Sequence, residues 1–125
     1  MEMNVRFDHF NFNVTDLARS IAFYEEALGL KVARRKEAPD GSFVLVFLTD
    51  GITGFSLELT WLRDHPHPYE LGEGEYHLCV RVSGDYDEVR RYHREMGCVC
   101  FENTDMGLYF IEDPDGYWIE ILPVK

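Results

Sequence analysis

The chain has 125 residues, of which 46% are hydrophobic, so it can bury one compact core but seldom two independent ones. Its 23 acidic and 12 basic residues give a net charge of −11, which argues against a nucleic acid partner and weighs against a strongly anionic substrate. Neither an apolar run of about 18 residues nor a basic, apolar leader is visible, so we expect no membrane partner and a cytoplasmic protein.

The first half of the sequence predicts a strand, a helix and three more strands. Residues 7–14 alternate between apolar and polar side chains, and the polar face consists of His9, Asn11 and Asn13. A helix with apolar residues at helical spacing follows, with Thr15 or Asp16 as its cap and Gly29 at its end. Strands near residues 31–38, 42–49 and 54–61, separated by turn-forming residues, complete a βαβββ module over residues 1–61.

The second half repeats this plan. A strand at 76–83 precedes a helix at about 86–96, capped by Ser83 or Asp85, and strands follow near 98–103, 107–112 and 116–122, the last two joined by a turn at 113–116. Residues 62–75 have no apolar periodicity and contain prolines and glycines, so we expect them to link the modules. The sequence therefore predicts an α+β fold in one domain, 1–125, built from two βαβββ modules, 1–61 and 76–125.

The duplication places one imidazole and one carboxylate at matching positions of each module. His9 and His77 open the first strands, and Glu58 and Glu120 lie near the ends of the last strands, each between apolar neighbours. All four are therefore expected on the faces opposite the helices, where a carboxylate is costly unless it is paired or bound to a metal. Imidazole and carboxylate suit Zn, Ni, Co, Mn or Fe, so the pattern predicts a metal centre of these four residues.

Several segments resemble the glyoxalase I (lactoylglutathione lyase) branch of the vicinal oxygen chelate superfamily. HFNFNVTDLARSIAFYEEALGLKV is similar to its opening module, LELT to its first acidic strand, YELG and YHLCVRV to its middle, and FIEDPDGYWIEIL to its closing signature. By this resemblance the four residues fall on the family's metal-ligand positions. It further implies Ni²⁺ or Co²⁺ as cofactor, with Zn²⁺ as the alternative, and a homodimer whose metal sites lie within one chain or across two.

The activity implied by the resemblance is isomerisation of the hemithioacetal of a 2-oxoaldehyde, such as methylglyoxal, and a thiol to a 2-hydroxyacyl thioester. A divalent ion would act as a Lewis acid on the ene-diolate that forms when the weakly acidic C–H proton leaves. The base must lie within hydrogen-bond reach of that carbon. The resemblance suggests Glu120 as the base, with Glu58 placed symmetrically for the other proton face.

Some positions depart from the glutathione-using members. Asn13 stands where they have an Arg, Leu62 where they have an Asn, and the acidic segments 72–75 and 102–105 where they have an Arg and a Lys. Because glutathione bears two carboxylates, these changes leave the identity of the thiol open.

Three side chains are candidates for substrate binding. Asn13 occupies the anchor position on the opening strand. Arg81 shares the strand face of His77, with a salt bridge at the rim as the alternative role. Trp118 shares the face of Glu120 and is expected to line an apolar substrate pocket or a dimer interface.

Other chemistry remains open. Epimerases of the superfamily usually carry Gln at the position of Glu58, and its dioxygenases and epoxide-opening thiol transferases usually need three protein ligands. A metal-free module that binds a small molecule or drug usually lacks the ligands that this chain retains.

The remaining histidines and cysteines are not predicted to form sites. His65 and His67 are expected to be exposed in a proline-rich acidic segment, and His93 on the solvated side of its helix. Cys79, Cys98 and Cys100 lack zinc-type spacing, and we expect Cys98 and Cys100 to be reduced core residues.

Overall fold

The computed structural model describes residues 1–124 and divides into two compact units, Met1–Tyr69 and Glu70–Lys125. The boundary falls inside the segment 62–75. Among the described residues, no helix has the length and apolar character needed to cross a membrane.

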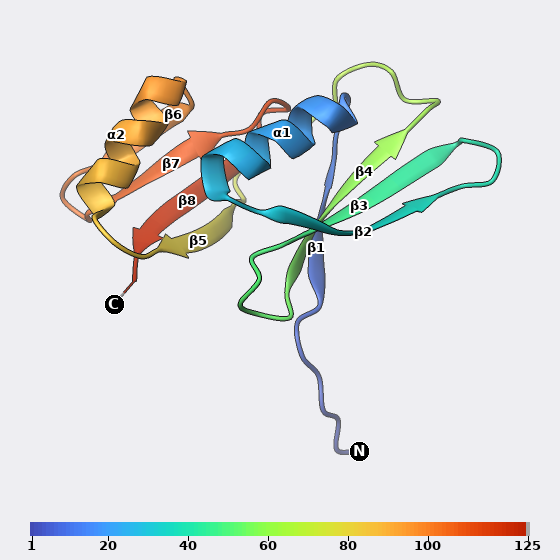
Figure 1. Ribbon diagram of the computed structural model, residues 1–125, viewed down its shortest axis with the longest axis horizontal. Coiled ribbons are helices and arrows are strands. Elements are labelled where there is room, and N and C mark those ends of the chain that lie inside the picture. Colours follow the sequence, from blue (N-terminus) through green and yellow to red (C-terminus); the bar gives the residue numbers. More distant parts are fainter. Residues whose placement is uncertain (125) are drawn as a thin grey trace. The chain divides into compact units, whose positions relative to one another are not determined.

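The first unit has the order βαβββ (Figure 1). Its elements are β1 (His9–Asn13), α1 (Leu17–Leu28), β2 (Lys31–Glu37), β3 (Phe43–Thr49) and β4 (Ser56–Leu62). The strands form one sheet in the order β1-β4-β3-β2, in which β1 and β4 are parallel and the other neighbours are antiparallel. The parallel pair brings the first and last strands of the unit side by side.

The second unit has the same order and the same topology. Its elements are β5 (Leu78–Val82), α2 (Tyr86–Met96), β6 (Val99–Asn103), β7 (Leu108–Glu112) and β8 (Trp118–Pro123). The sheet order is β5-β8-β7-β6, with β5 and β8 parallel. The predicted α+β fold of two βαβββ modules is therefore confirmed.

Both helices begin and end at the predicted residues. Asp16 and Asp85 are the N-caps, and each carboxylate accepts the backbone N–H three residues later. Gly29 and Gly97 end the helices in the left-handed conformation, with φ of 67° and 77°, which a residue without a Cβ adopts without strain.

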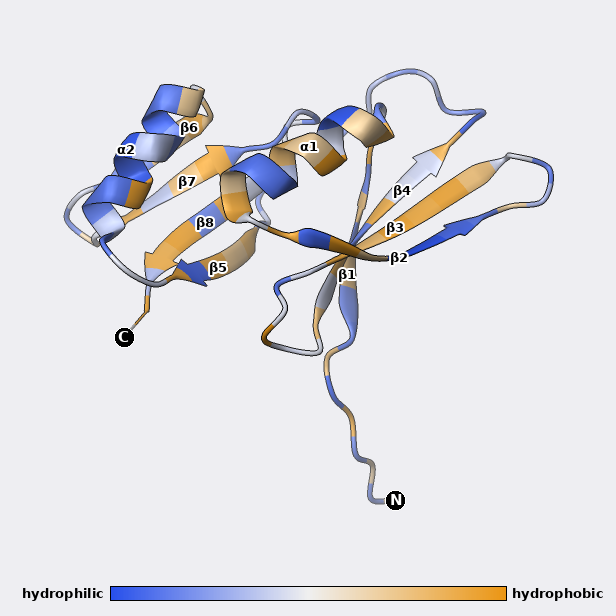
Figure 2. Cartoon of the chain, viewed as in Figure 1, coloured by the Kyte–Doolittle hydropathy of each residue, from blue (hydrophilic) through white to orange (hydrophobic). Residues whose placement is uncertain are grey.

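The core of the first unit consists of alternate side chains from adjacent strands. In β4, Leu57 and Leu59 are buried, whereas Glu58 between them points to the opposite face. Strand β3 is hydrophobic along its length, while the edge strand β2 is largely hydrophilic and exposed throughout (Figure 2). Phe10, expected on the core face of β1, is 42% exposed.

The core of the second unit includes one histidine. His93 is fully buried, so the prediction that it lies on the solvated side of its helix was wrong. Its Nδ1 is 2.7 Å from the hydroxyl oxygen of Tyr109, which is also fully buried, and burial raises the pKa of that phenol. The hydrogen bond satisfies two polar groups in the core, which helical periodicity alone did not reveal.

The turn before β8 is fixed by a buried aspartate. Asp113 Oδ1 accepts hydrogen bonds from the backbone N–H groups of Asp115 and Tyr117, both at 2.9 Å. Gly116 within this turn has a φ of 93°, which favours glycine. The turn therefore fixes the backbone just before β8 begins at Trp118.

Candidate metal centre

In the first unit, β1 and β4 bring His9 and Glu58 together. Because these strands are parallel with Asn11 opposite Glu58, His9 lies on the same face two residues earlier. His9 Nε2 is 3.7 Å from Glu58 Oε2. The imidazole side chain is 40% exposed and the carboxylate side chain 14%, so the pair is accessible from the imidazole side.

The second unit repeats this pair. Cys79 lies opposite Glu120 in the parallel pairing of β5 with β8, and His77 is two residues before Cys79. His77 Nε2 is 3.1 Å from Glu120 Oε1, with side-chain exposures of 41% and 15%. The near-identical exposures indicate that the duplication preserved the environment of the ligands as well as their types.

An aromatic ring completes each pair. Phe47 lies opposite Glu58 and Phe110 opposite Glu120 in the antiparallel pairings. The Phe47 ring meets His9 edge-to-face with centroids 5.5 Å apart, and Phe110 meets His77 at 4.9 Å. Neither phenylalanine was predicted from the sequence, although aligning the third and fourth strands of each module places each ring opposite its glutamate.

Further polar contacts hold the first pair. Asp8 Oδ2 is 2.7 Å from His9 Nδ1, and this hydrogen bond holds the pKa of Asp8 below its usual value. With the proton on Nδ1, the lone pair of Nε2 is free for a metal, which is the arrangement found in many metal-binding histidines. On the other side, Thr60 Oγ1 lies 3.0 Å from Glu58 Oε1 and 2.6 Å from Asn11 Oδ1.

A cation that the sequence did not single out lies beside the first pair. The Arg34 guanidinium carbon is 4.0 Å from the centroid of the Phe47 ring. Arg34 pairs with Phe47 across β2 and β3, so it shares the face of Glu58. Its signal in the sequence was hidden, because the run KVARRKE gives no indication of which basic side chain faces the site.

In the second unit, the Cys79 thiol lies beside the carboxylate of Glu120. Burial, together with the charge of Glu120, raises the pKa of Cys79 to about 11. The thiol is therefore protonated at neutral pH.

The four predicted ligands thus occur as two pairs. Among residues 1–124, no group of three or more His, Cys, Asp or Glu side chains gathers around one point. Imidazole nitrogen and carboxylate oxygen nonetheless fit a divalent transition metal, and Asp8 prepares His9 for that role. Each unit therefore holds one His–Glu pair, and a single metal centre of all four residues stays a prediction.

The structure places the three substrate-binding candidates at different distances from these pairs. Asn13 accepts a hydrogen bond from Asn11 at 2.9 Å, on the face of His9. Arg81 donates to the backbone oxygen of Pro123 at 2.8 Å, near the far end of β5. Trp118 meets edge-to-face, at 5.3 Å, the same Phe110 ring that meets His77.

The histidines of the segment after β4 lie in an aromatic stack. His65 stacks on Tyr69 with centroids 3.9 Å apart and lies at the same centroid distance from His67. His67 is exposed as predicted, whereas His65 is half-buried by the stack. All three cysteines are free thiols; Cys98 and Cys100 are half-buried rather than in the core.

Comparison with known families identifies the superfamily of the chain. Residues 6–121 match the model of the Glyoxalase/Bleomycin resistance protein/Dioxygenase superfamily. The chain belongs to this superfamily. The resemblance identified from the sequence is confirmed.

Several similar proteins within the superfamily are named lactoylglutathione lyase or glyoxalase I. The lactoylglutathione lyase of Neisseria meningitidis is 38% identical, and the match covers 97% of this chain and 92% of that protein. The lactoylglutathione lyase of Haemophilus influenzae is 37% identical over 94% of this chain and 91% of its own length. A structure described as a trypanothione-dependent glyoxalase I from Leishmania major has a TM-score of 0.83 and 34% identity, covering 96% of this chain and 87% of that one.

Proposed function

We propose that this chain is a lyase of the glyoxalase I type, which isomerises the hemithioacetal of a 2-oxoaldehyde, such as methylglyoxal, and a thiol to a 2-hydroxyacyl thioester. The observation that carries the proposal is the duplicated His–Glu–Phe arrangement on the faces opposite the helices. Relatives named lactoylglutathione lyase, 32–38% identical over most of the chain, support the same activity.

His9, Glu58, His77 and Glu120 would hold one divalent ion in each complete site. Two imidazoles and two carboxylates suit Ni²⁺ or Co²⁺, which we expect, and Zn²⁺ as the alternative. When bound, the ion supplies Lewis-acid stabilisation of the negative charge that develops on the substrate oxygens.

Glu120 is the proposed base. Its carboxylate would take the proton from the carbon that bears sulfur and return it to the adjacent carbon. The hydroxyl oxygen on the first carbon gives up its proton and becomes a carbonyl, and the ketone oxygen on the adjacent carbon takes up a proton and becomes a hydroxyl, so no proton is gained or lost overall.

Glu58 lies 3.0 Å from the Thr60 hydroxyl, and Glu120 lies 3.1 Å from His77 Nε2. We assign the base to Glu120 because it shares its strand face with Trp118, a candidate lining residue of the substrate pocket, and Glu58 would serve the other proton face.

The pairs differ in what they offer the rest of the substrate. Arg34 on β2, held over Phe47, presents a guanidinium on the face of Glu58. Asn13 lies on β1, which pairs with the strand of Glu58, β4. Trp118 presents an aromatic ring on the face of Glu120. Arg81 would act only at the edge of the site, since its guanidinium bonds the backbone near the end of β8.

We also propose a homodimer and a cytoplasmic location. Two half-sites per chain are compatible with metal sites built across two subunits, as we expect from the family. Three free cysteines are consistent with a reducing compartment.

The decisive experiment is reconstitution followed by assay. Protein purified without chelator is loaded with Ni²⁺, Co²⁺ or Zn²⁺, its metal content is measured, and thioester formation from methylglyoxal is followed by ultraviolet absorbance with glutathione and with other thiols. We expect turnover with Ni²⁺ or Co²⁺ that chelator removes. Metal-loaded protein that forms no thioester with any thiol would reject the glyoxalase proposal, and protein that binds none of the three metals would favour a binding module.

A further inference from the structure

We propose that Asn11 is a positioning residue for Glu58. It accepts the hydrogen bond of the Thr60 hydroxyl in competition with Glu58, and this leaves the carboxylate available to the metal ion. The second half of the inference rests on the proposed function, because it takes Glu58 as a metal ligand. The three side chains share one face of the first unit, since Asn11 on β1 lies opposite Glu58 on β4 and Thr60 follows Glu58 by two residues.

The Thr60 hydroxyl has one proton and two acceptors within reach. Its Oγ1 is 2.6 Å from Asn11 Oδ1 and 3.0 Å from Glu58 Oε1. A hydroxyl donates only one full hydrogen bond, so the two oxygen atoms compete for the same proton. The shorter distance, to Asn11, is the stronger contact by geometry.

A third residue fixes the direction in which the Asn11 amide faces. Asn11 Nδ2 donates to Asn13 Oδ1 at 2.9 Å, so the amide nitrogen is turned to Asn13 and the carbonyl oxygen to Thr60. In the reverse orientation Asn11 would present N–H groups to the hydroxyl, and the Thr60 proton would go to Glu58 instead. The bond to Asn13 therefore keeps Asn11 in place as an acceptor.

Competition from Asn11 makes it less costly for Glu58 to bind a cation. Glu58 Oε2 lies on the side of His9, 3.7 Å from its Nε2, whereas Oε1 faces Thr60. Without the Asn11 acceptor, the hydroxyl would donate to Glu58, and a carboxylate that turned to a cation would leave the half-buried Thr60 donor unsatisfied. With Asn11 present, the hydroxyl keeps its partner whether or not Glu58 binds a cation.

The second unit does not repeat this arrangement. The positions that match Asn11, Thr60 and Asn13 hold Cys79, Leu122 and Arg81. A leucine has no proton to donate, and the Arg81 guanidinium is bonded to the backbone oxygen of Pro123. The three polar residues therefore belong to the first unit alone, and we expect only Glu58 to depend on them.

The first test needs neither metal nor substrate. The ¹³C resonances of the Asn11 amide carbonyl and the Glu58 carboxylate are compared, at one neutral pH, in wild type, Thr60→Val and Thr60→Ser. Thr60→Val should move the Asn11 resonance more than the Glu58 resonance, because Asn11 loses the hydrogen bond. Thr60→Ser keeps the hydroxyl and should leave both close to wild type. A larger change at Glu58 than at Asn11 would overturn the proposal.

The second test measures Co²⁺ affinity, by competition with a chelator, in a double-mutant cycle. Asn11→Leu removes the acceptor but keeps the size of the side chain, and we expect it to weaken Co²⁺ binding about tenfold. Thr60→Val alone should bind Co²⁺ like wild type, and N11L/T60V should regain most of the lost affinity. This rescue distinguishes positioning from structural damage, because two damaging substitutions would weaken binding further.

Matched variants complete the cycle. Asn4→Leu, at an exposed position outside the sheets, makes the same substitution and should bind Co²⁺ like wild type. Asn11→Ala also removes the acceptor and replaces Asn11→Leu in the cycle if that variant is poorly folded.

The outcomes separate this inference from the proposed function. Wild-type protein that binds no Co²⁺ but shows the expected ¹³C changes would reject the metal centre, and with it the second half of the inference, while the bond from Thr60 to Asn11 stands. Co²⁺ binding that Asn11→Leu leaves unchanged would overturn the positioning role without touching the proposed activity. A loss in Asn11→Leu that Thr60→Val does not reverse would also overturn it.

Discussion

The two units share a plan and a pair of ligands, yet they surround those ligands differently. His9 and Glu58 are held by polar groups, Asp8 and Thr60, whereas Glu120 lies beside a protonated thiol and a row of aromatic rings. Duplication thus preserved the residues that suit a metal and let their neighbours diverge. We propose that the second pair, beside the rings of Phe110 and Trp118, is the side where the substrate reacts.

The helices diverge in a similar way. Helix α1 buries Ser20, Tyr24 and Ala27, whereas α2 buries only His93. Unlike α1, α2 has Asp87 and Glu88 in its first turn and Arg94 in its last turn, and these charges complement the helix dipole. Its attachment to the sheet includes one buried hydrogen bond.

Replacing each of the two glutamates by glutamine is expected to give the largest effects, and it tests whether Glu120 is the base and Glu58 mainly a metal ligand. Glu120→Gln should retain part of the metal and lower kcat by about 10²–10⁴-fold, because the amide cannot accept the proton. Glu58→Gln should lower metal affinity with a smaller loss of kcat. Metal content and turnover of both variants, measured on the same preparation, check this. Unchanged turnover in Glu120→Gln would transfer the base role to Glu58 or to water.

Replacing Asp8 tests whether its hydrogen bond to His9 contributes to metal affinity. Asp8→Asn should weaken metal affinity by roughly 10- to 100-fold, because Nδ1 loses a charged acceptor. Since the pKa of Asp8 lies below its usual 3.8, its contribution should persist at neutral pH and be lost only as the pH falls below that value. Competition with a chelator measures the affinity, and Glu25→Gln on the exposed face of α1 is the charge-matched control. Equal affinities of the two variants would contradict the role of Asp8.

The buried hydrogen bond between His93 and Tyr109 can be removed by deleting one atom, the phenol oxygen. Tyr109→Phe should reduce the free energy of unfolding by about 1–3 kcal/mol, because His93 Nδ1 loses the phenol in the core. Denaturant titration measures the change. The exposed Tyr76 of the same unit provides the control, and Tyr76→Phe should stay within about 0.5 kcal/mol of wild type. A loss no larger than the control would show that the bond contributes little.

Matched cap variants give the smallest effect. Asp16→Ala and Asp85→Ala should each cost about 1 kcal/mol of unfolding free energy, measured by denaturant titration. The loss should be greater for Asp85, because α2 buries less side-chain surface to hold it in place. A greater loss for Asp16 would mean that packing of α2 outweighs its electrostatics.

Local patterns in the sequence were sufficient for the elements and for the pairing of ligands. The βαβββ order, the caps and the exposed faces of Glu58 and Glu120 follow from periodicity and turn chemistry, which act over a few residues. The duplication then related His9 to His77 and the two glutamates to each other.

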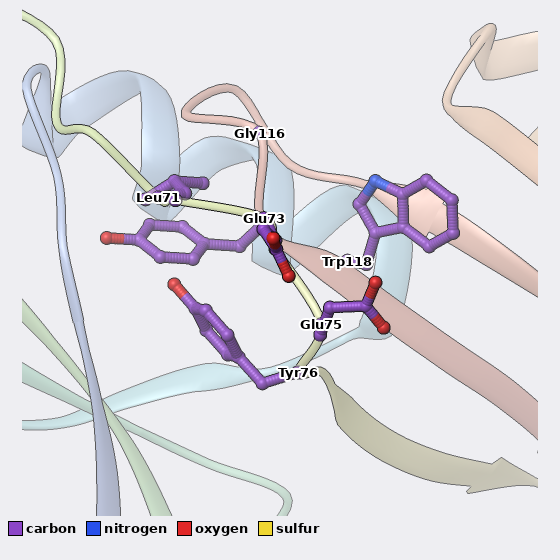
Figure 3. A pocket seen from close by; sticks show the side chains of 9 residues that line it. Leu71, Glu73, Glu75, Tyr76, Gly116 and Trp118 are labelled. Carbon is purple, nitrogen blue, oxygen red and sulfur yellow. The ribbon is translucent and has the colours of Figure 1, made fainter.

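Strand pairing and packing decided the rest. Phe47, Phe110 and Arg34 come to the ligand faces through cross-strand register, and His93 is buried because Tyr109 from β7 meets it. The pocket beside Trp118 forms where two segments about 40 residues apart in the chain, 71–76 and 116–118, meet (Figure 3). Such contacts depend on groups that are distant in sequence, so only the tertiary structure could supply them.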